Sequence, residues 1–164
     1  MLRAMDVAQY FLNKDPERKI FDKNLVHKDG RTFYAGNARL NKYLHMAQNL
    51  YIAKTGDRLF SDDLYAYDNG AVVPDVQEYY SVLYTKSDAP SLPGDIKIFL
   101  DRVYKFLENA SLEELIELSH EDTEWERKHG YFYKPDQRMD STRHAEEYKE
   151  QYRDALIVME RMTV

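Results

Sequence analysis

The 164-residue sequence contains no cysteine, and this absence excludes several kinds of site. Without cysteine the chain has no disulfides, no thiolate nucleophile and no cysteine-ligated zinc. No stretch approaches the roughly 20 apolar residues of a membrane span, and the first residues lack the apolar core of a signal peptide. A cysteine-free chain of this kind suits a reducing compartment, so we expect a cytoplasmic protein that does not contact membranes.

Basic residues and glycines are also few. There are 23 Lys and Arg against 29 Asp and Glu, so the formal net charge is −6, and no local run of basic residues offsets it. An acidic surface repels phosphate backbones, so nucleic-acid binding is not expected. With six glycines and five prolines the chain has no linker-like stretch, and its length predicts a single domain over residues 1–164.

What the sequence does contain is helical periodicity. Apolar residues recur at three- and four-residue spacing, and a capping box at Ser111 and Glu114 marks one helix start. The segment 38–55 is apolar on most sides, so we place it at the centre of the core, with Gly56 as its stop. The pattern predicts an all-α bundle of about five to six helices, the clearest being at 5–12, 38–55, 95–110, 111–130 and 141–162.

Two short segments interrupt this helical pattern. Residues 20–34 carry β-branched and aromatic residues around Asp29-Gly30, which predicts a small hairpin or a loop. The stretch YAYDNGAVVP begins as an alternating extended segment and turns at Asn69-Gly70. Pro74 then suits the first position of a helix. We interpret this stretch as a corner that docks an extended strip onto the helices. A lone glycine there does not make a phosphate-binding loop.

The best enzymatic candidate in the sequence is the pair His120 and Glu124. Four residues apart on a helix, they share a face. They can bind a metal together, or the histidine can act as a general base that the glutamate positions. A zinc helix of the HExxH type needs a second histidine where this chain has Glu124, and no third ligand has recognisable spacing. Structural roles for His120 and for Trp125, the only tryptophan, are therefore favoured, and no catalytic, cofactor-binding or metal-binding residue is predicted.

Tyrosine is abundant, at 14 residues. Its ring gives a large contact area at low entropic cost and carries a polar tip, so it serves both cores and interfaces. Several tyrosines cluster in sequence around Pro74, where a partner interface and ordinary packing are both open. The candidates for a partner interface are Tyr65, Tyr67, Tyr79 and Tyr80.

The segments NARLNKYLHMAQNLYIAKTGDRLF, YAYDNGAVVP and LIELSHEDTEW occur in this order along the chain. Together they resemble the Panacea domain of SocA-like antitoxins, and most closely its phage-associated, GepA-like members. The family pattern is a K-L-x-K-L-L-Y-x-A-Q helix, then a glycine and a P-V-V-P run, then a histidine a few residues before a tryptophan. The matching positions are Leu40, Lys42, Leu44, Ala47, Gln48, Gly70, Val72, Val73, Pro74, His120 and Trp125.

This resemblance implies an antitoxin, encoded with its toxin on a prophage or other mobile element, that neutralises the toxin by direct binding. Some members of the family instead act as adaptors that deliver a toxin to a protease, and a phage-encoded modulator of a host enzyme is a further alternative. The resemblance supplies no catalytic residue and no cofactor. A small hydrolase or metal enzyme that uses His120 and Glu124 is the remaining hypothesis.

Overall fold

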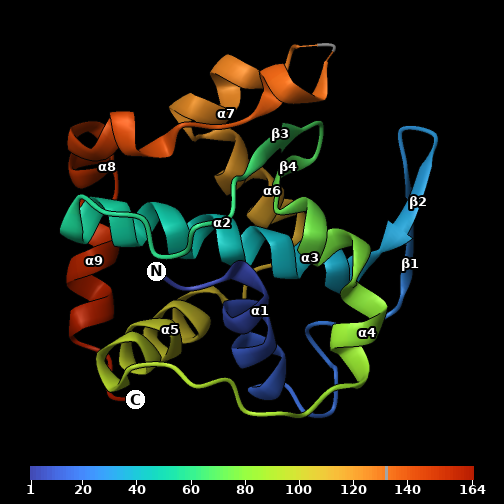
Figure 1. Ribbon diagram of the computed structural model, residues 1–164, viewed down its shortest axis with the longest axis horizontal. Helices are drawn as coiled ribbons and strands as arrows, with labels where there is room; N and C mark the ends of the chain where they lie inside the picture. The colour runs from blue at the N-terminus through green and yellow to red at the C-terminus, as the bar shows by residue number, and fades with distance from the viewer. Residues whose placement is uncertain (132) are drawn as a thin grey trace.

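A long central helix organises the computed structural model, which describes residues 1–131 and 133–164. This helix, α2 (Ala35–Thr55), ends at Gly56, whose positive φ of 82° gives the left-handed cap that the sequence predicts. Figure 1 shows α2 crossing the middle of the molecule with other elements on every side. The expectation that this segment occupies the centre of the core is confirmed, because most of its residues are buried.

The remaining helices surround α2 in groups. Figure 1 shows α1 and α5 on one side, α6 and α7 on the other, α8 and α9 at one end, and α3 and α4 at the opposite end. Two 3₁₀ turns, η1 and η2, connect α7 to α8. Their bounds are α1 (Ala4–Asn13), α3 (Pro74–Glu78), α4 (Tyr80–Thr85), α5 (Gly94–Leu107), α6 (Leu112–His120), α7 (Thr123–Lys128), η1 (Lys134–Gln137), η2 (Ser141–His144), α8 (Ala145–Gln151) and α9 (Arg153–Glu160).

Two antiparallel hairpins complete the fold. The first joins β1 (Leu25–Lys28) to β2 (Arg31–Tyr34) through Asp29-Gly30, as the sequence predicts, and it projects beside α4 in Figure 1. The second joins β3 (Tyr65–Tyr67) to β4 (Gly70–Val72). The sequence predicts a corner here; the turn instead folds the chain back on itself and pairs Ala66 with Ala71 before Pro74 opens α3.

The fold is predominantly helical, as predicted, but the described residues form nine α-helices, more than the expected five or six. The difference has local causes. Asp122 caps α7 by accepting a hydrogen bond from the backbone N–H of Glu124, so the expected helix at 111–130 is two helices. The backbone leaves helical geometry at Tyr152 (φ −100°, ψ 11°), which divides the expected last helix into α8 and α9.

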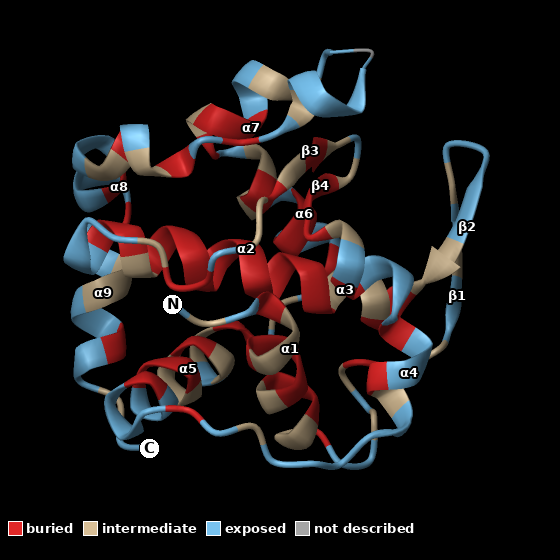
Figure 2. Ribbon diagram, viewed as in Figure 1, coloured by how far each residue is buried: buried red, intermediate tan, exposed pale blue. Residues whose placement is uncertain are grey.

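The core is built mainly on α2 and the helices around it. Figure 2 shows buried residues along α2 and on the inward sides of α1, α5 and α6, while the first hairpin and the outer face of α9 are largely exposed. Tyr43 of α2 packs edge-to-face against Phe11 and Phe21. None of the described helices combines the length and apolarity that a bilayer crossing demands.

Candidate functional site

Buried polar side chains on α2 hold the surrounding segments in place. A polar group taken out of water must find a hydrogen-bond partner, so each such side chain fixes whatever it contacts. The side-chain oxygen of Gln48 accepts from the backbone N–H of Leu59 at 2.7 Å. That of Asn41 accepts from Val73 at 2.9 Å, just before Pro74 opens α3. The buried polar residues of α2 are Asn41, Lys42, His45, Gln48 and Asn49.

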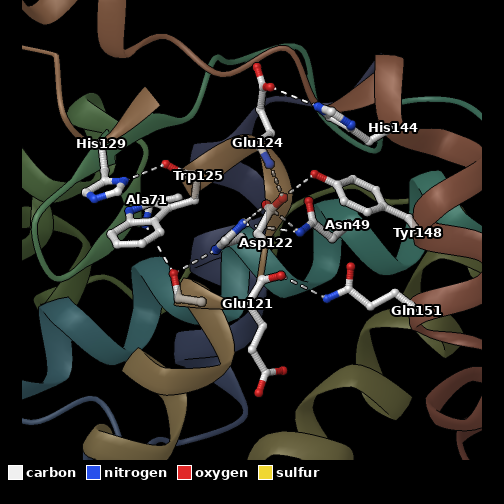
Figure 3. A network of polar contacts seen from close by, with 12 residues as sticks. Asn49, Ala71, Glu121, Asp122, Glu124, Trp125, His129, His144, Tyr148 and Gln151 are labelled. Carbon is white, nitrogen blue, oxygen red and sulfur yellow. Dashed lines mark hydrogen bonds and ion pairs between the residues drawn. The ribbon is translucent and has the colours of Figure 1, made fainter. Parts of the chain in front are cut away.

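Asp122 is the centre of a buried polar network (Figure 3). Its carboxylate contacts His45 Nε2 at 2.6 Å and accepts from Asn49 Nδ2 at 2.8 Å, both on α2, and it also accepts from the Tyr148 hydroxyl on α8. Burial raises the pKa of Asp122, but these hydrogen bonds outweigh burial and lower its pKa to about 2. An ionised carboxylate therefore ties α2 and α8 to the junction between α6 and α7.

His45 also contacts Ser119, with 3.0 Å between Nδ1 and Oγ, so a serine, a histidine and an aspartate lie in line. This order resembles a hydrolase triad. All of these side chains are 0% exposed. Ser119 Oγ also accepts from the backbone N–H of Ala71 at 3.3 Å. A substrate therefore cannot reach Ser119 unless the second hairpin moves away. In this geometry the hydrogen bonds of Ser119 link α2, α6 and β4.

Gly70 lies directly against this network and has a positive φ of 116°. A Cβ atom added at Gly70 would meet the Ser119 hydroxyl and would lie 2.6 Å from the Cε atom of Lys42. Both the backbone conformation and the close packing therefore require glycine at this position. The turn of the second hairpin thus approaches α2 closely enough to bring Lys42 against its backbone.

A cavity of about 410 Å³ lies between the two hairpins. Its lining comes from β2, the first half of α2, the β3–β4 hairpin and Gln77 of α3. Lys42 belongs to this lining although its side chain is only 2% exposed. Burial, with a smaller contribution from the positive charge of Lys28, lowers the pKa of Lys42 to about 8. Within residues 1–131 and 133–164, its ammonium group has no ion-pair or hydrogen-bond partner.

Trp125 closes the other side of the second hairpin. Its indole lies between the rings of His120 and His129, at 3.9 Å and 4.2 Å between ring centroids, and its Nε1 donates to the Tyr67 carbonyl at 2.8 Å. The His120 ring contacts the Asp68 carbonyl at 3.2 Å. Burial lowers the pKa of His120 despite that hydrogen bond. His120 and Trp125 thus both hold the backbone of the β3–β4 hairpin.

The structure does not join His120 to Glu124. The Glu124 carboxylate contacts His144 Nε2 at 2.9 Å and accepts from the backbone N–H of Asp140 at 2.6 Å. The partners of His120 are Trp125 and Asp68. Among the described residues, no cluster of at least three histidine, aspartate or glutamate side chains has the arrangement of a metal site.

The candidate interface tyrosines differ in exposure. Tyr65 and Tyr67 on β3 are half-buried, and Tyr79, between α3 and α4, is 48% exposed. Tyr80 is 1% exposed and its hydroxyl donates to the carbonyls of Phe21 and Asp22. Including Tyr80 in a partner interface was therefore wrong: its ring fills the core, because the start of α4 turns that position inward.

The positions quoted for the family resemblance gather around α2. Leu40, Leu44 and Ala47 are core residues, and the polar positions Lys42 and Gln48 face the cavity lining and the 59–60 loop. The remaining positions lie on β4, at the start of α3, at the end of α6 and on α7, and they surround the second hairpin; they are Gly70, Val72, Val73, Pro74, His120 and Trp125.

A family model described as antitoxin SocA-like, Panacea domain, matches residues 40–126, more than half of the chain. The chain belongs to the SocA-like Panacea family. The Panacea match begins within α2 and ends in α7, so it includes Lys42, both strands of the second hairpin, and Ser119 and Asp122 of the buried network. The GepA-like subgroup stays a prediction. No curated protein and no solved structure matches the chain.

The sequence interpretation missed His45, Ser119 and Asp122, and it did not predict the burial of Lys42. One signal was present: α2 is apolar on most sides, so polar residues on the same helix must also be buried and must have partners. Which side chains those partners are depends on the α6–α7 junction and on α8, which are distant in sequence.

Proposed function

We propose that this chain is an antitoxin that neutralises a cognate protein toxin by direct binding. The observation that carries the proposal is membership of the SocA-like Panacea family. The geometry of the site supports a role in binding, because the buried polar network links helices and a hairpin and leaves its serine without exposed surface. Under this proposal the chain catalyses no reaction and needs no cofactor.

The end of the molecule that carries both hairpins offers the contact surface. Leu25 at the base of β1 is exposed, and so are Tyr79 and Val82 on the adjoining helical segment. Tyr34 of β2 contacts Tyr80 of α4 at 6.2 Å between ring centroids, so these exposed groups belong to one end of the molecule. Exposed aromatic and aliphatic side chains of this kind are the composition expected of a protein interface.

The proposal is tested by expressing the product of the neighbouring gene alone and together with this chain. We expect the neighbour to stop growth alone, growth to recover on co-expression, and the two proteins to co-purify at an unchanged toxin level. A toxin that disappears from the cell instead indicates delivery to a protease. A neighbour that is harmless and does not co-purify contradicts the antitoxin proposal.

Tyr79→Ala tests the proposed surface. The ring is exposed and its loss should leave the fold intact, so we expect at least about tenfold weaker toxin binding with an unchanged melting temperature. Val158→Ala, at a similarly exposed apolar side chain on α9 at the opposite end of the molecule (Figure 1), is the control. Equal affinities of the two variants for the toxin would remove Tyr79 from the interface.

A further inference from the structure

The cavity between the hairpins contains a cation, Lys42, that has no counter-ion among the residues that the structure describes. Lys42 enters it from α2, and the turn of the second hairpin packs against the aliphatic part of its side chain, so that the residue is only 2% exposed while it lines the cavity. Desolvating an ammonium group is costly unless an anion or hydrogen-bond acceptors compensate. No carboxylate within the described residues takes that place. A charge kept in this position without a partner indicates that the partner comes from outside the chain.

The rest of the cavity is suited to a small polar anion. Asn69 and Gln77 bring side-chain amides to its lining that can donate hydrogen bonds to a carboxylate, whereas Asn37 and Asn41 already donate to the carbonyls of Gln77 and Asn37. Arg31 of the lining forms an exposed ion pair with Asp68, at 3.0 Å, which joins the tips of the two hairpins. An exposed pair of this kind contributes little to stability, so an entering ligand can displace it at small cost.

We propose that this cavity is a receptor for a carboxylate, supplied by an aspartate or glutamate side chain that a protein partner inserts against Lys42. A protein-borne carboxylate is favoured over a free acid because the exposed apolar residues Tyr79 and Val82 closely follow Gln77 of the cavity lining along the chain, so that a protein can cover them while it fills the cavity. The identification of the partner as the toxin rests on the proposed function. The affinity of the cavity for a carboxylate does not depend on that proposed function.

The charges around the cavity favour an anion. Lys28 of β1 and His120 of α6 lie close enough to influence Lys42 electrostatically, and Arg31 lines the cavity wall. Asp68 is acidic, but it is paired with Arg31. Because burial lowers the pKa of Lys42 to about 8, carboxylate binding should be strong at pH 6.5 and should weaken as the pH rises through 8.

The first arm of the test uses the protein alone at pH 6.5. The probe is N-acetyl-glutamate methylamide, with the glutamine analogue as the uncharged control and sodium chloride for ionic strength. In NMR spectra of the backbone amides, we expect saturable chemical-shift changes at Asn69 and Gly70 with the glutamate probe only. These changes should be absent in Lys42→Met. Shifts that chloride reproduces, or that persist in Lys42→Met, overturn the proposal. If citrate saturates the same shift changes at concentrations about 100-fold lower than the glutamate probe, the cavity is a site for a free acid. That result also overturns the proposal.

The second arm measures the affinity of the neighbour-encoded partner for wild type, for Lys42→Met and for Lys54→Met. Lys54 is exposed near the end of the same helix and is the matched control. We expect binding to weaken at least about tenfold in Lys42→Met, because a buried charge-assisted hydrogen bond is lost, and to be unchanged in Lys54→Met. Equal binding by Lys42→Met overturns the proposal while the antitoxin function stands. If wild type does not bind the partner, the antitoxin function fails and the first arm alone decides the carboxylate site.

Discussion

Replacing Lys42 by methionine should stabilise the free protein, which is the reverse of the usual effect of a core substitution. The two side chains are similar in length, so methionine fills the same space between α2 and the second hairpin. What the change removes is a buried ammonium group that has no partner within the described residues. Binding and stability therefore oppose each other at this position: the variant should fold more stably and bind its partner less tightly.

The magnitude follows from the pKa of Lys42. Its ordinary value of 10.5 is lowered to about 8 in the folded state. Because the folded-state pKa lies below the unfolded one, the unfolded chain binds this proton more tightly, and stability rises with pH between about 8 and about 10.5. The shift corresponds to about 3 kcal/mol of destabilisation at pH 7.

The assay is urea unfolding of wild type, Lys42→Met and Lys54→Met at pH 6.5, 8.0 and 9.5. We expect Lys42→Met to exceed wild type by about 3 kcal/mol at pH 6.5 and by about 1–1.5 kcal/mol at pH 9.5. Burial raises the pKa of Tyr43 and Tyr80, which lowers stability at alkaline pH, but this effect is common to all variants and cancels in the difference. A Lys42→Met protein that is less stable at pH 6.5, or a difference independent of pH, would refute the reasoning.

The other predictions concern the supports of the second hairpin. Gly70→Ala should lower the free energy of unfolding by at least about 2 kcal/mol, because the added methyl group requires a strained positive φ and displaces Ser119 or Lys42; an unchanged urea midpoint would contradict this close packing. Asp122→Asn should cost about 3 kcal/mol through the loss of hydrogen bonds to its buried carboxylate, against no effect of the exposed control Asp57→Asn. Because the folded-state pKa of Asp122 is lowered from 3.8 to about 2, its stabilisation of about 2 kcal/mol is fully present above pH 3.8 and is lost as the pH falls through 2, so acid unfolding of Asp122→Asn should be shallower than that of wild type over this window. Trp125→Ala should cost about 3–5 kcal/mol in the same urea assay, and thermal melts equal to wild type would show that the indole does not support the fold.

Local signals in the sequence were enough to predict the elements that depend on neighbouring residues. Gly56 ends α2 in the left-handed conformation, Ser111 and Glu114 form the capping box, and Asp29-Gly30 turns the first hairpin. Each of these features is decided within a few residues of chain, so composition and spacing suffice.

The candidate site was less predictable because it depends on contacts between distant segments. In the sequence, nothing near Asp122 distinguishes it from the other acidic residues of its segment. Its partners His45 and Tyr148 come from α2 and α8, which are distant in sequence. Tyr80 follows the exposed Tyr79 and points inward only because Phe21 and Asp22 present their carbonyls to it. The burial of Lys42 likewise requires the turn at Gly70 to lie over it, which no periodicity in α2 indicates.

The central claim is that this chain acts by binding a protein through the end of the molecule that carries the two hairpins. The most direct test is a calorimetric titration of the purified protein with the product of the neighbouring gene, using wild type and Lys42→Met. We expect saturable binding by wild type and binding at least about tenfold weaker for a Lys42→Met protein that remains folded. A neighbour product that gives no heat of binding with wild type, and whose toxicity this chain does not relieve, would contradict it.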